Sequence, residues 1–296
     1  MKFGICGNLE KTELPQVIER LMARCQKEKV QYILPDTLAK GLRGKIDKQF
    51  LLRSNVVSEK KLPTACDIVI SIGGDGTILR IARLVSSHAT PILGINLGKL
   101  GFLAEVSLEE LDDCITEILR GDYRIEDRMM VQACINKSKQ CIFALNDIVL
   151  SQTDSSRMFS VQTFVNGEFL SKFTCDGTIV ATPTGSTAYM LSNGGPIVTP
   201  TNHSMLINPI SPHSLTARTV VVPEESIITL KVQTAHGKMR ITADGQSQIF
   251  VRLPLEVAIE RSLLVTKLVK RMNTSYYDVL RRKLHWGRDA RNLSGR

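Results

Sequence analysis

Hydrophobic positions in the first 125 residues alternate between short apolar runs and stripes with helical spacing. The apolar runs, which predict strands, span residues 1–6, 31–34, 66–72 and 91–96. The stripes recur every three or four residues and predict helices around 17–22, 78–85 and 108–119. Strands that alternate with helices are typical of a largely parallel α/β sheet. Ligands of such sheets bind beyond the carboxyl ends of the strands.

From about residue 126 the pattern changes to short β-rich runs at hairpin distances. Asn166-Gly167 separates two of these runs, and Asn-Gly is a strong signal for a two-residue hairpin turn. His236-Gly237 separates the runs 227–233 and 238–242, and Asp244-Gly245 precedes a further run. Such a succession predicts an all-β, sandwich-like domain. Helical spacing returns at residues 275–284.

These patterns predict an α/β fold class with two domains. Residues 1–125 form a Rossmann-like α/β domain, and residues 126–260 form a β-rich, sandwich-like domain. Residues 261–296 form a C-terminal segment whose helix packs back on the α/β domain.

Composition narrows the possible functions. The chain has 296 residues and 43% hydrophobic content, and no apolar run approaches the ~20 residues of a membrane span. The apolar part of the N-terminus is too short for a signal peptide. Seven scattered cysteines without a C-x-x-C pair predict neither a disulfide framework nor a zinc site. These features predict a cytoplasmic protein without a membrane partner.

The chain carries a formal net charge of +9, and much of it is local. Residues 262–296 contain nine Lys or Arg and two Asp, a net charge of +7. A basic tail is compatible with nucleic acid, with a polyanionic small substrate or with a solvated surface. No nucleic-acid-binding module accompanies it, so we expect no nucleic-acid partner.

The segment Gly73-Gly74-Asp75-Gly76-Thr77 is the first candidate for chemistry. It follows an apolar strand and precedes a helical stripe, an arrangement that aims backbone N–H groups at a phosphate. A carboxylate in such a loop repels its ligand unless it accepts a hydroxyl proton or holds a metal ion. The loop has neither the Walker A spacing nor that of the dinucleotide fingerprint. It resembles the loop of the G-G-D-G-[TS] kinases, which include NAD kinases, lipid kinases and 6-phosphofructokinases.

A second cluster spans residues 176–196. Thr182-Pro183-Thr184-Gly185-Ser186-Thr187 places four hydroxyls in six residues, and Tyr189 adds an aromatic face. Small hydroxyl residues with Pro and Gly build a rigid loop with many donors and acceptors. The segment is therefore predicted to be a binding loop, a helix cap or both.

Six motifs in order make the resemblance specific. They are G-G-D-G-T (73–77), N-L-G-K-L-G-F-L (96–103), L-N-D (145–147), D-G-T-I-V-A-T-P-T-G-S-T-A-Y (176–189), P-I-S-P-H-S-L (209–215) and D-G-Q (244–246). Together they resemble NAD kinase, which transfers a phosphoryl group from ATP to the 2′-hydroxyl of the adenosine ribose of NAD. The similarity covers about residues 66–285.

The resemblance implies roles for individual residues. Asp75 corresponds to the catalytic base, and Asn146 and Asp147 correspond to the pair that binds the adenine and ribose side. The further positions implied to contact the substrates are Gly73, Gly74, Gly76, Thr77, Arg80, Arg157, Asp176, Thr187, Ala188, Tyr189, Ser192 and Gln246.

The implied substrates are NAD and ATP, with a divalent metal ion such as Mg²⁺ on the donor phosphates and no metal ligand from the protein. The implied assembly is a homodimer or homotetramer. Three other interpretations stay open: a lipid kinase that shares the G-G-D-G-T loop, a non-catalytic nucleotide sensor, and a nucleic-acid-binding protein that uses the basic tail. A lipid kinase requires an apolar pocket or a membrane-binding surface, and the soluble composition argues against it.

Overall fold

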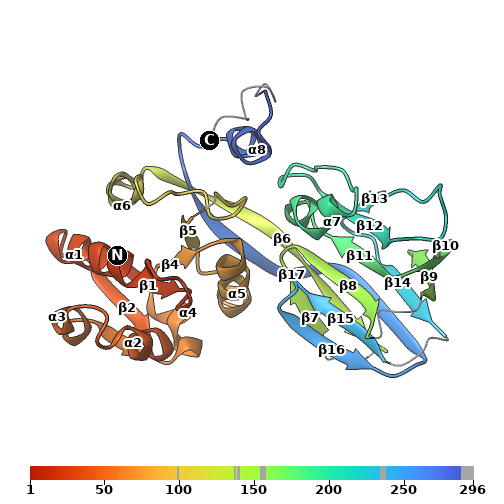
Figure 1. Cartoon of the computed structure of the whole chain (residues 1–296), viewed down its shortest axis with the longest axis horizontal. Coiled ribbons are helices and arrows are strands. Elements are labelled where there is room, and N and C mark those ends of the chain that lie inside the picture. The colour runs from red at the N-terminus through yellow and green to blue at the C-terminus, as the bar shows by residue number, and fades with distance from the viewer. Residues whose placement is uncertain (99, 137, 139–140, 154–157, 234–237, 288–296) are drawn as a thin grey trace. The chain divides into compact units, whose positions relative to one another are not determined.

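A computed structural model describes residues 1–98, 100–136, 138, 141–153, 158–233 and 238–287 (Figure 1). The chain divides into two compact units. Unit 1 comprises Met1–Asp127 and Thr266–Arg296, and unit 2 comprises Arg128–Val265. The long strands β6 (Tyr123–Ile135) and β17 (Leu255–Arg271) each continue from one unit into the other.

The sheet of unit 1 is parallel. Its strand order is β3-β2-β1-β4-β5-β17, which is the strand order of a Rossmann fold. The order reverses between β1 and β4, so the loops that follow these two strands lie at the topological switch point. Apart from β17, the strands are β1 (Lys2–Gly7), β2 (Gln31–Pro35), β3 (Asn55–Val57), β4 (Ile68–Gly73) and β5 (Ile92–Asn96).

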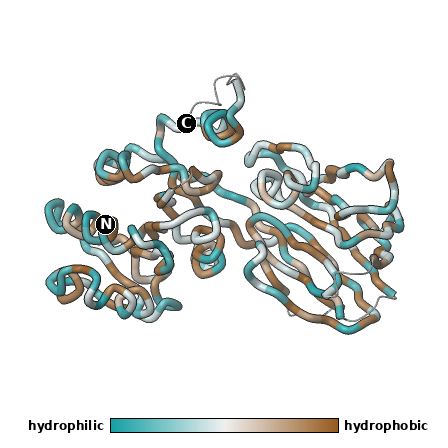
Figure 2. The backbone as a smooth tube through the Cα atoms, viewed as in Figure 1, coloured by the Kyte–Doolittle hydropathy of each residue, from teal (hydrophilic) through white to brown (hydrophobic). Residues whose placement is uncertain are grey.

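Amphipathic helices cover this sheet, and their apolar faces join its core. The core of unit 1 contains side chains of β1 and β4 together with Leu14, Ile18 and Leu21 of the first helix. Figure 2 shows the strands of unit 1 as mostly hydrophobic and its helices as mixed in hydropathy. The helices are α1 (Leu14–Lys27), α2 (Asp36–Leu42), α3 (Lys48–Leu52), the 3₁₀ turn η1 (Glu59–Lys61), α4 (Leu62–Ala65), α5 (Asp75–Val85), α6 (Leu111–Arg120) and α8 (Tyr276–Leu284).

The C-terminal helix α8 belongs to unit 1. Its Lys283 ammonium donates a hydrogen bond to the backbone oxygen of Leu100 and lies 5.9 Å from the ring centroid of Phe102. Part of the basic C-terminal charge therefore contacts the loop that follows β5.

Unit 2 contains two antiparallel layers. The first has the order β10-β9-β14-β17, with β6 paired to β17 and β7 paired to β6, and the second has the order β13-β12-β11-β8-β15-β16. The strands of the first layer not yet given are β7 (Cys141–Ala144), β9 (Phe159–Val165), β10 (Glu168–Cys175) and β14 (Ile228–Val232). Those of the second layer are β8 (Asp147–Gln152), β11 (Gly177–Ala181), β12 (Ser204–Ile210), β13 (Val220–Pro223), β15 (Met239–Ala243) and β16 (Ser247–Val251).

One hydrophobic core joins both layers of unit 2, as expected for a sandwich. It contains Ile148 and Leu150 of β8 together with Val161 of β9 and Val257 of β17. A smaller cluster lies on the other face of the second layer and includes Val149 of β8. Successive side chains of β8 therefore point to opposite faces, as the two-residue period of a strand requires.

Two of the predicted hairpins are confirmed. Strands β9 and β10 pair across Asn166-Gly167, where both residues have positive φ, and β15 pairs with β16 across Asp244-Gly245. The third prediction is wrong: β14 and β15 lie in different layers, each paired with other strands. His236 and Gly237 between them lie outside the described residues.

A disulfide joins Cys134 to Cys141, which the scattered cysteines did not predict. The two residues stand directly opposite each other in the β6–β7 pair, with 4.3 Å between their Cα atoms. Strand register brings them together, and spacing alone does not reveal register. Among the described residues, no helix is both long enough and apolar enough to cross a bilayer.

Candidate active site

The glycine loop lies at the end of β4, where α5 begins. Gly74 is the N-cap of α5, and its N–H group donates to the Thr77 hydroxyl over 3.4 Å. The neighbouring loop after β1 is hydrogen-bonded to the same strand end, because the Asn8 N–H donates to the Ile72 oxygen. Gly73, Gly74, Asp75, Gly76 and Thr77 therefore surround a helix N-terminus at the switch point, where an α/β sheet offers an anion site.

The carboxylate of Asp75 accepts three backbone hydrogen bonds. Its Oδ1 accepts from Leu103 and Ala104 at 3.0 Å each, and its Oδ2 accepts from Phe102 at 2.8 Å. All three donors belong to the loop after β5, which carries the N-L-G-K-L-G-F-L motif. The loop thus fixes the carboxylate while Oδ2 retains capacity for a further donor, because a carboxylate offers about four acceptor positions.

Arg80 of α5 forms an ion pair with Glu59 of η1. Its guanidinium is thus engaged within unit 1, although its side chain stays 40% exposed. The other arginine implied by the resemblance, Arg157, lies outside the described residues.

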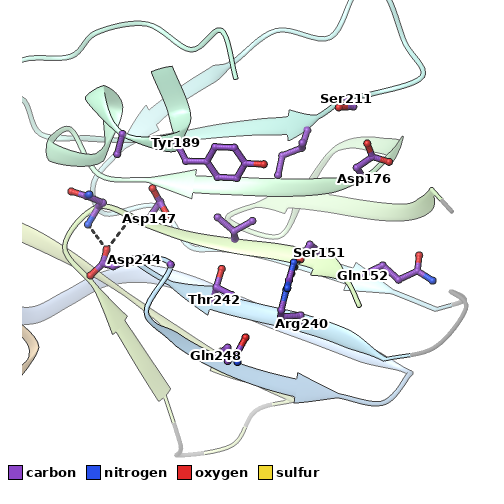
Figure 3. A pocket seen from close by; sticks show the side chains of 15 residues that line it. Asp147, Ser151, Gln152, Asp176, Tyr189, Ser211, Arg240, Thr242, Asp244 and Gln248 are labelled. Carbon is purple, nitrogen blue, oxygen red and sulfur yellow. Dashed lines mark hydrogen bonds between the residues drawn. The ribbon is translucent and has the colours of Figure 1, made fainter. Parts of the chain in front are cut away.

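Unit 2 carries a polar cavity of about 790 Å³ (Figure 3). Strands β8, β15 and β16 line one side, and the segments around Asp176, Tyr189 and Ser211 line the other. The lining residues are Asn146, Asp147, Val149, Ser151, Gln152, Asp176, Ala188, Tyr189, Ile210, Ser211, Arg240, Thr242, Asp244, Gly245 and Gln248.

Strand alternation explains how one strand supplies side chains to both the core and the cavity, from opposite faces of the sheet. On β8, Ile148 and Leu150 enter the sandwich core, whereas Asp147, Val149 and Ser151 line the cavity. Arg240 and Thr242 line it in the same way from β15, where the alternate residues are buried in the core.

The carboxyl group of Asp147 is buried, with only 5% of the residue exposed. Burial, and secondarily the nearby Asp244 carboxylate, raise the pKa of Asp147 to about 7. Both effects disfavour the charged form, so this carboxyl group exchanges its proton near neutral pH.

Side-chain hydroxyls of the loop at residues 182–187 donate hydrogen bonds to backbone oxygens and so stabilise the loop itself. Thr182 donates to the Leu145 oxygen over 2.6 Å, and Thr187 donates to the Thr184 oxygen. The Ser186 hydroxyl lies within hydrogen-bond distance of the Pro183 oxygen, at 2.7 Å, and of the Val198 oxygen, at 3.1 Å. Most of the hydroxyls that predicted a binding surface are therefore used to hold the 3₁₀ turn η2 (Thr184–Thr187) and the short helix α7 (Tyr189–Ser192). Ala188, between η2 and α7, and Tyr189, the first residue of α7, line the cavity.

Five of the predicted contact residues come together in this cavity. They are Asn146, Asp147, Asp176, Ala188 and Tyr189. Thr187 and Gln246 lie next to lining residues in the sequence, and Ser192 follows Tyr189 on α7, but none of the three lines the cavity. Gly73, Gly74, Asp75, Gly76, Thr77 and Arg80 form the separate cluster of unit 1.

Sequence reasoning missed several polar residues on the sheet face. Ser151, Arg240, Thr242 and Gln248 lie on three neighbouring strands of the second layer. The sequence does contain a signal for them: polar and apolar residues alternate along these strands, which indicates that one face of the sheet carries polar side chains. The cavity lining therefore includes the guanidinium of Arg240 as well as the carboxyl groups of Asp147, Asp176 and Asp244.

Comparison with known families decides the assignment. Residues 3–123 match the model of the ATP-NAD kinase N-terminal domain, and residues 145–271 match that of the ATP-NAD kinase C-terminal domain. The chain belongs to the NAD kinase family. The six motifs that indicated this resemblance all lie within, or directly beside, the matched ranges.

Full-length relatives agree with the family models. The chain is 38% identical over 293 residues to an NAD kinase of Bacteroides fragilis, covering 98% of this chain and 100% of the relative. It is 33% identical over 302 residues to an NAD kinase of Cytophaga hutchinsonii, covering 99% and 100%.

Solved structures share the fold of this family member. A yeast NADH kinase complexed with NADH aligns with a TM-score of 0.88 at 24% identity, covering 98% of this chain and 89% of that one. An NAD kinase from Archaeoglobus fulgidus in complex with ATP aligns with a TM-score of 0.74 at 24% identity, covering 97% of each chain.

Proposed function

We propose how this chain carries out the reaction of its family. As an NAD kinase it is a phosphotransferase that makes NADP from NAD and ATP. The observation that carries the residue assignment is the polar cavity of unit 2, which gathers five of the predicted contact residues. A lipid kinase is not favoured, because both family models match NAD kinase domains and this cavity is lined largely by polar side chains.

The lining residues suit a dinucleotide. Ribose hydroxyls are donors, and the carboxylates of Asp147 and Asp176 are acceptors for them. Tyr189 offers an aromatic face for a base. Arg240, whose Nε donates to the Ser151 hydroxyl over 3.3 Å, supplies a cation for the diphosphate. Asn146 offers both a donor and an acceptor to the edge of the adenine ring.

Asp75 is the proposed base. A ribose hydroxyl is a poor nucleophile at neutral pH, and phosphoryl transfer depends mainly on positioning and charge neutralisation. The remaining acceptor position on Oδ2 of Asp75 orients the 2′-hydroxyl and takes its proton as the 2′-oxygen bonds to the γ-phosphorus of ATP. The bond from that phosphorus to the β–γ bridging oxygen breaks, and ADP leaves. The three backbone donors hold the carboxylate in one orientation for this step.

The donor phosphates bind at the glycine loop. The N-terminus of α5 points N–H groups and a positive helix-dipole end toward them. A divalent ion such as Mg²⁺ arrives with the donor nucleotide and neutralises phosphate charge. Among the described residues no group of three His, Cys, Asp or Glu side chains gathers to hold such an ion, so the phosphates are its proposed ligands.

One assay tests the proposed function. The purified chain is incubated with NAD, ATP and Mg²⁺, and NADP is detected with an NADP-specific dehydrogenase. NADP formation that depends on both substrates is expected. Failure with every triphosphate and with polyphosphate, together with phosphorylation of a lipid, would contradict the proposal.

A further inference from the structure

The carboxylate of Asp244 holds the backbone of the Asn-Asp pair. Its Oδ2 accepts from the Leu145 N–H over 3.0 Å, and its Oδ1 accepts from the N–H groups of Asn146 and Asp147 over 2.7 and 3.3 Å (Figure 3). The Asp244 N–H in turn donates to the Asp147 oxygen over 3.0 Å. Four hydrogen bonds thus join one residue of the β15–β16 turn to three consecutive residues of another segment.

The opposite side of the same segment is held by Thr182. Its hydroxyl donates to the Leu145 oxygen over 2.6 Å, and its N–H donates to the Asn146 oxygen over 2.8 Å. Gly185 leaves room for this packing, because a β-carbon there would lie 2.0 Å from the Asn146 oxygen. The N–H groups of Leu145, Asn146 and Asp147 are therefore held by the Asp244 carboxylate. The backbone oxygens of Leu145 and Asn146 are held by the uncharged Thr182.

The Asp244 carboxylate also acts on the Asp147 side chain through its charge. Both carboxyl groups lie at the same end of the cavity and are at least nine-tenths buried (Figure 3). The charge of Asp244 contributes to the raised pKa of Asp147. Three N–H donors stabilise the charged form of Asp244, so Asp147 is the member of the pair that keeps its proton.

The other ionisable groups of the cavity lining, Arg240, Asp176 and Tyr189, lie at other positions than the Asp147–Asp244 pair. The guanidinium of Arg240, on β15, is hydrogen-bonded to Ser151, four residues beyond Asp147. Asp176 precedes β11 and lies at the Ser211 end of the cavity, and Tyr189 lies on α7 (Figure 3). Among the described residues that line the cavity, Asp244 is thus the charged group at the same end as Asp147.

We propose that Asp244 is a positioning residue for the NAD kinase reaction: its carboxylate fixes the backbone of Asn146 and Asp147 for the adenosine half of NAD, and its charge acts on the Asp147 side chain. This inference rests on the proposed function for the identity of the ligand. It gives Asp147 a pH-dependent role: it donates a hydrogen bond when protonated and accepts hydrogen bonds when ionised.

Asp244→Asn is the variant that tests this role. Asp244 and Gly245 both have positive φ in a tight turn, and Asn tolerates that conformation, so the turn is retained. The substitution removes the charge and part of the acceptor capacity. We expect the KM for NAD to rise by about tenfold to hundredfold, which is the range for losing charge-assisted hydrogen bonds, while the KM for ATP changes by less than about threefold.

A pH profile separates positioning from a merely structural role. The apparent pKa that governs kcat/KM for NAD through Asp147 should fall in Asp244→Asn, because one of the two causes that raise it is removed while burial remains. This titration should be absent in Asp147→Asn. Thr182→Val is the matched neutral control: it releases the Leu145 oxygen, raises the KM for NAD, and leaves the apparent pKa in place.

Carbon-13 NMR of labelled aspartate carboxyl groups provides the second measurement. The Asp147 resonance, assigned by its loss in Asp147→Asn, should titrate near neutral pH in the wild-type protein and at lower pH in Asp244→Asn. An ordinary pKa for Asp147 in the wild type would overturn the proposal even if Asp244→Asn fails to fold. So would a folded Asp244→Asn protein with unchanged pKa and KM. Absence of NADP formation by the wild type would instead refute the proposed function and leave the titration result standing.

Discussion

A β-carbon on Gly101 would lie 1.9 Å from Oδ1 of Asp75. The second glycine of the N-L-G-K-L-G-F-L motif is therefore required by the close approach of a carboxylate from another element. The neighbouring residues Phe102, Leu103 and Ala104 can then donate their N–H groups to Asp75. Two motifs that are separate in the sequence therefore form one structure around the proposed base.

Gly101→Ala should displace this loop from Asp75. The new methyl group cannot share space with Oδ1, so the three N–H bonds lengthen or break. Because a misplacement of about 1 Å can cost roughly 10²-fold in rate, we expect kcat to fall by about that factor. Steady-state kinetics and a melting curve measure this. A folded variant with wild-type kcat would show that the loop does not orient Asp75.

Asp75→Asn retains the shape of the side chain and removes the base. We expect kcat to fall by roughly 10²- to 10⁴-fold, the range for general-base catalysis, with a much smaller change in the KM for NAD. Asp67→Asn, at an exposed aspartate of the same unit, serves as the control and should keep full activity. Near-normal kcat in Asp75→Asn would exclude Asp75 as the base.

Asp147→Ala removes a group that we place at the adenosine ribose. The ribose then loses a hydrogen-bond partner, so the KM for NAD should rise by about tenfold or more while the KM for ATP stays within about threefold. Initial-rate measurements with each substrate varied in turn distinguish the two. The opposite pattern would place Asp147 at the donor site.

The raised pKa of Asp147 also predicts how stability depends on pH. The unfolded chain releases this proton near the ordinary pKa of 3.8, whereas the folded chain retains it until about pH 7. The folded state therefore binds more protons between these values, and the free energy of unfolding falls as pH rises through this window. Above it, the ionised buried group lowers stability by an amount on the order of a few kcal/mol.

Asn cannot ionise, so the free energy of unfolding of Asp147→Asn should not fall in this way as the pH rises. We expect its melting temperature to exceed that of the wild type at pH 8, with the difference shrinking or reversing at pH 4.5. Thermal unfolding at both pH values measures it. A difference that does not change with pH would mean that Asp147 titrates normally in the folded protein.

The resemblance also predicts that a neighbouring subunit completes the dinucleotide pocket, with Asp176 reaching the nicotinamide half of the ligand. Asp176 lies exposed at the Ser211 end of the cavity, where a second chain has access. Mixing inactive Asp75→Asn with inactive Asp176→Ala protein should restore part of the activity, because some mixed sites carry both wild-type residues.

Dilution gives an independent check on assembly. Specific activity should fall below the dissociation constant of the dimer, and NAD should shift the equilibrium toward assembly by mass action. Full activity in a stable monomer, or no recovery on mixing despite demonstrated subunit exchange, would show that each site is built from one chain.

The sequence by itself determined the elements that local chemistry specifies. The strand, glycine turn and helix around Asp75 follow from an apolar run, two glycines and a helical stripe, and the structure has β4, Gly74 and α5 at these positions. The turn at Asn166-Gly167 likewise needs two residues that tolerate positive φ. Such signals are contained within a few neighbouring residues, so they are readable without knowledge of the fold.

Only the tertiary structure decided which distant segments meet. It placed β14 and β15 in different layers, paired Cys134 with Cys141, and used the hydroxyls of Thr182 and Ser186 to build a loop. It also buried Asp147 and joined Asp244 to the Asn-Asp pair almost a hundred residues away, and burial first, then the Asp244 charge, raise the pKa of Asp147. Register, burial and charge proximity depend on the packing of whole strands, and no short stretch of sequence contains that information.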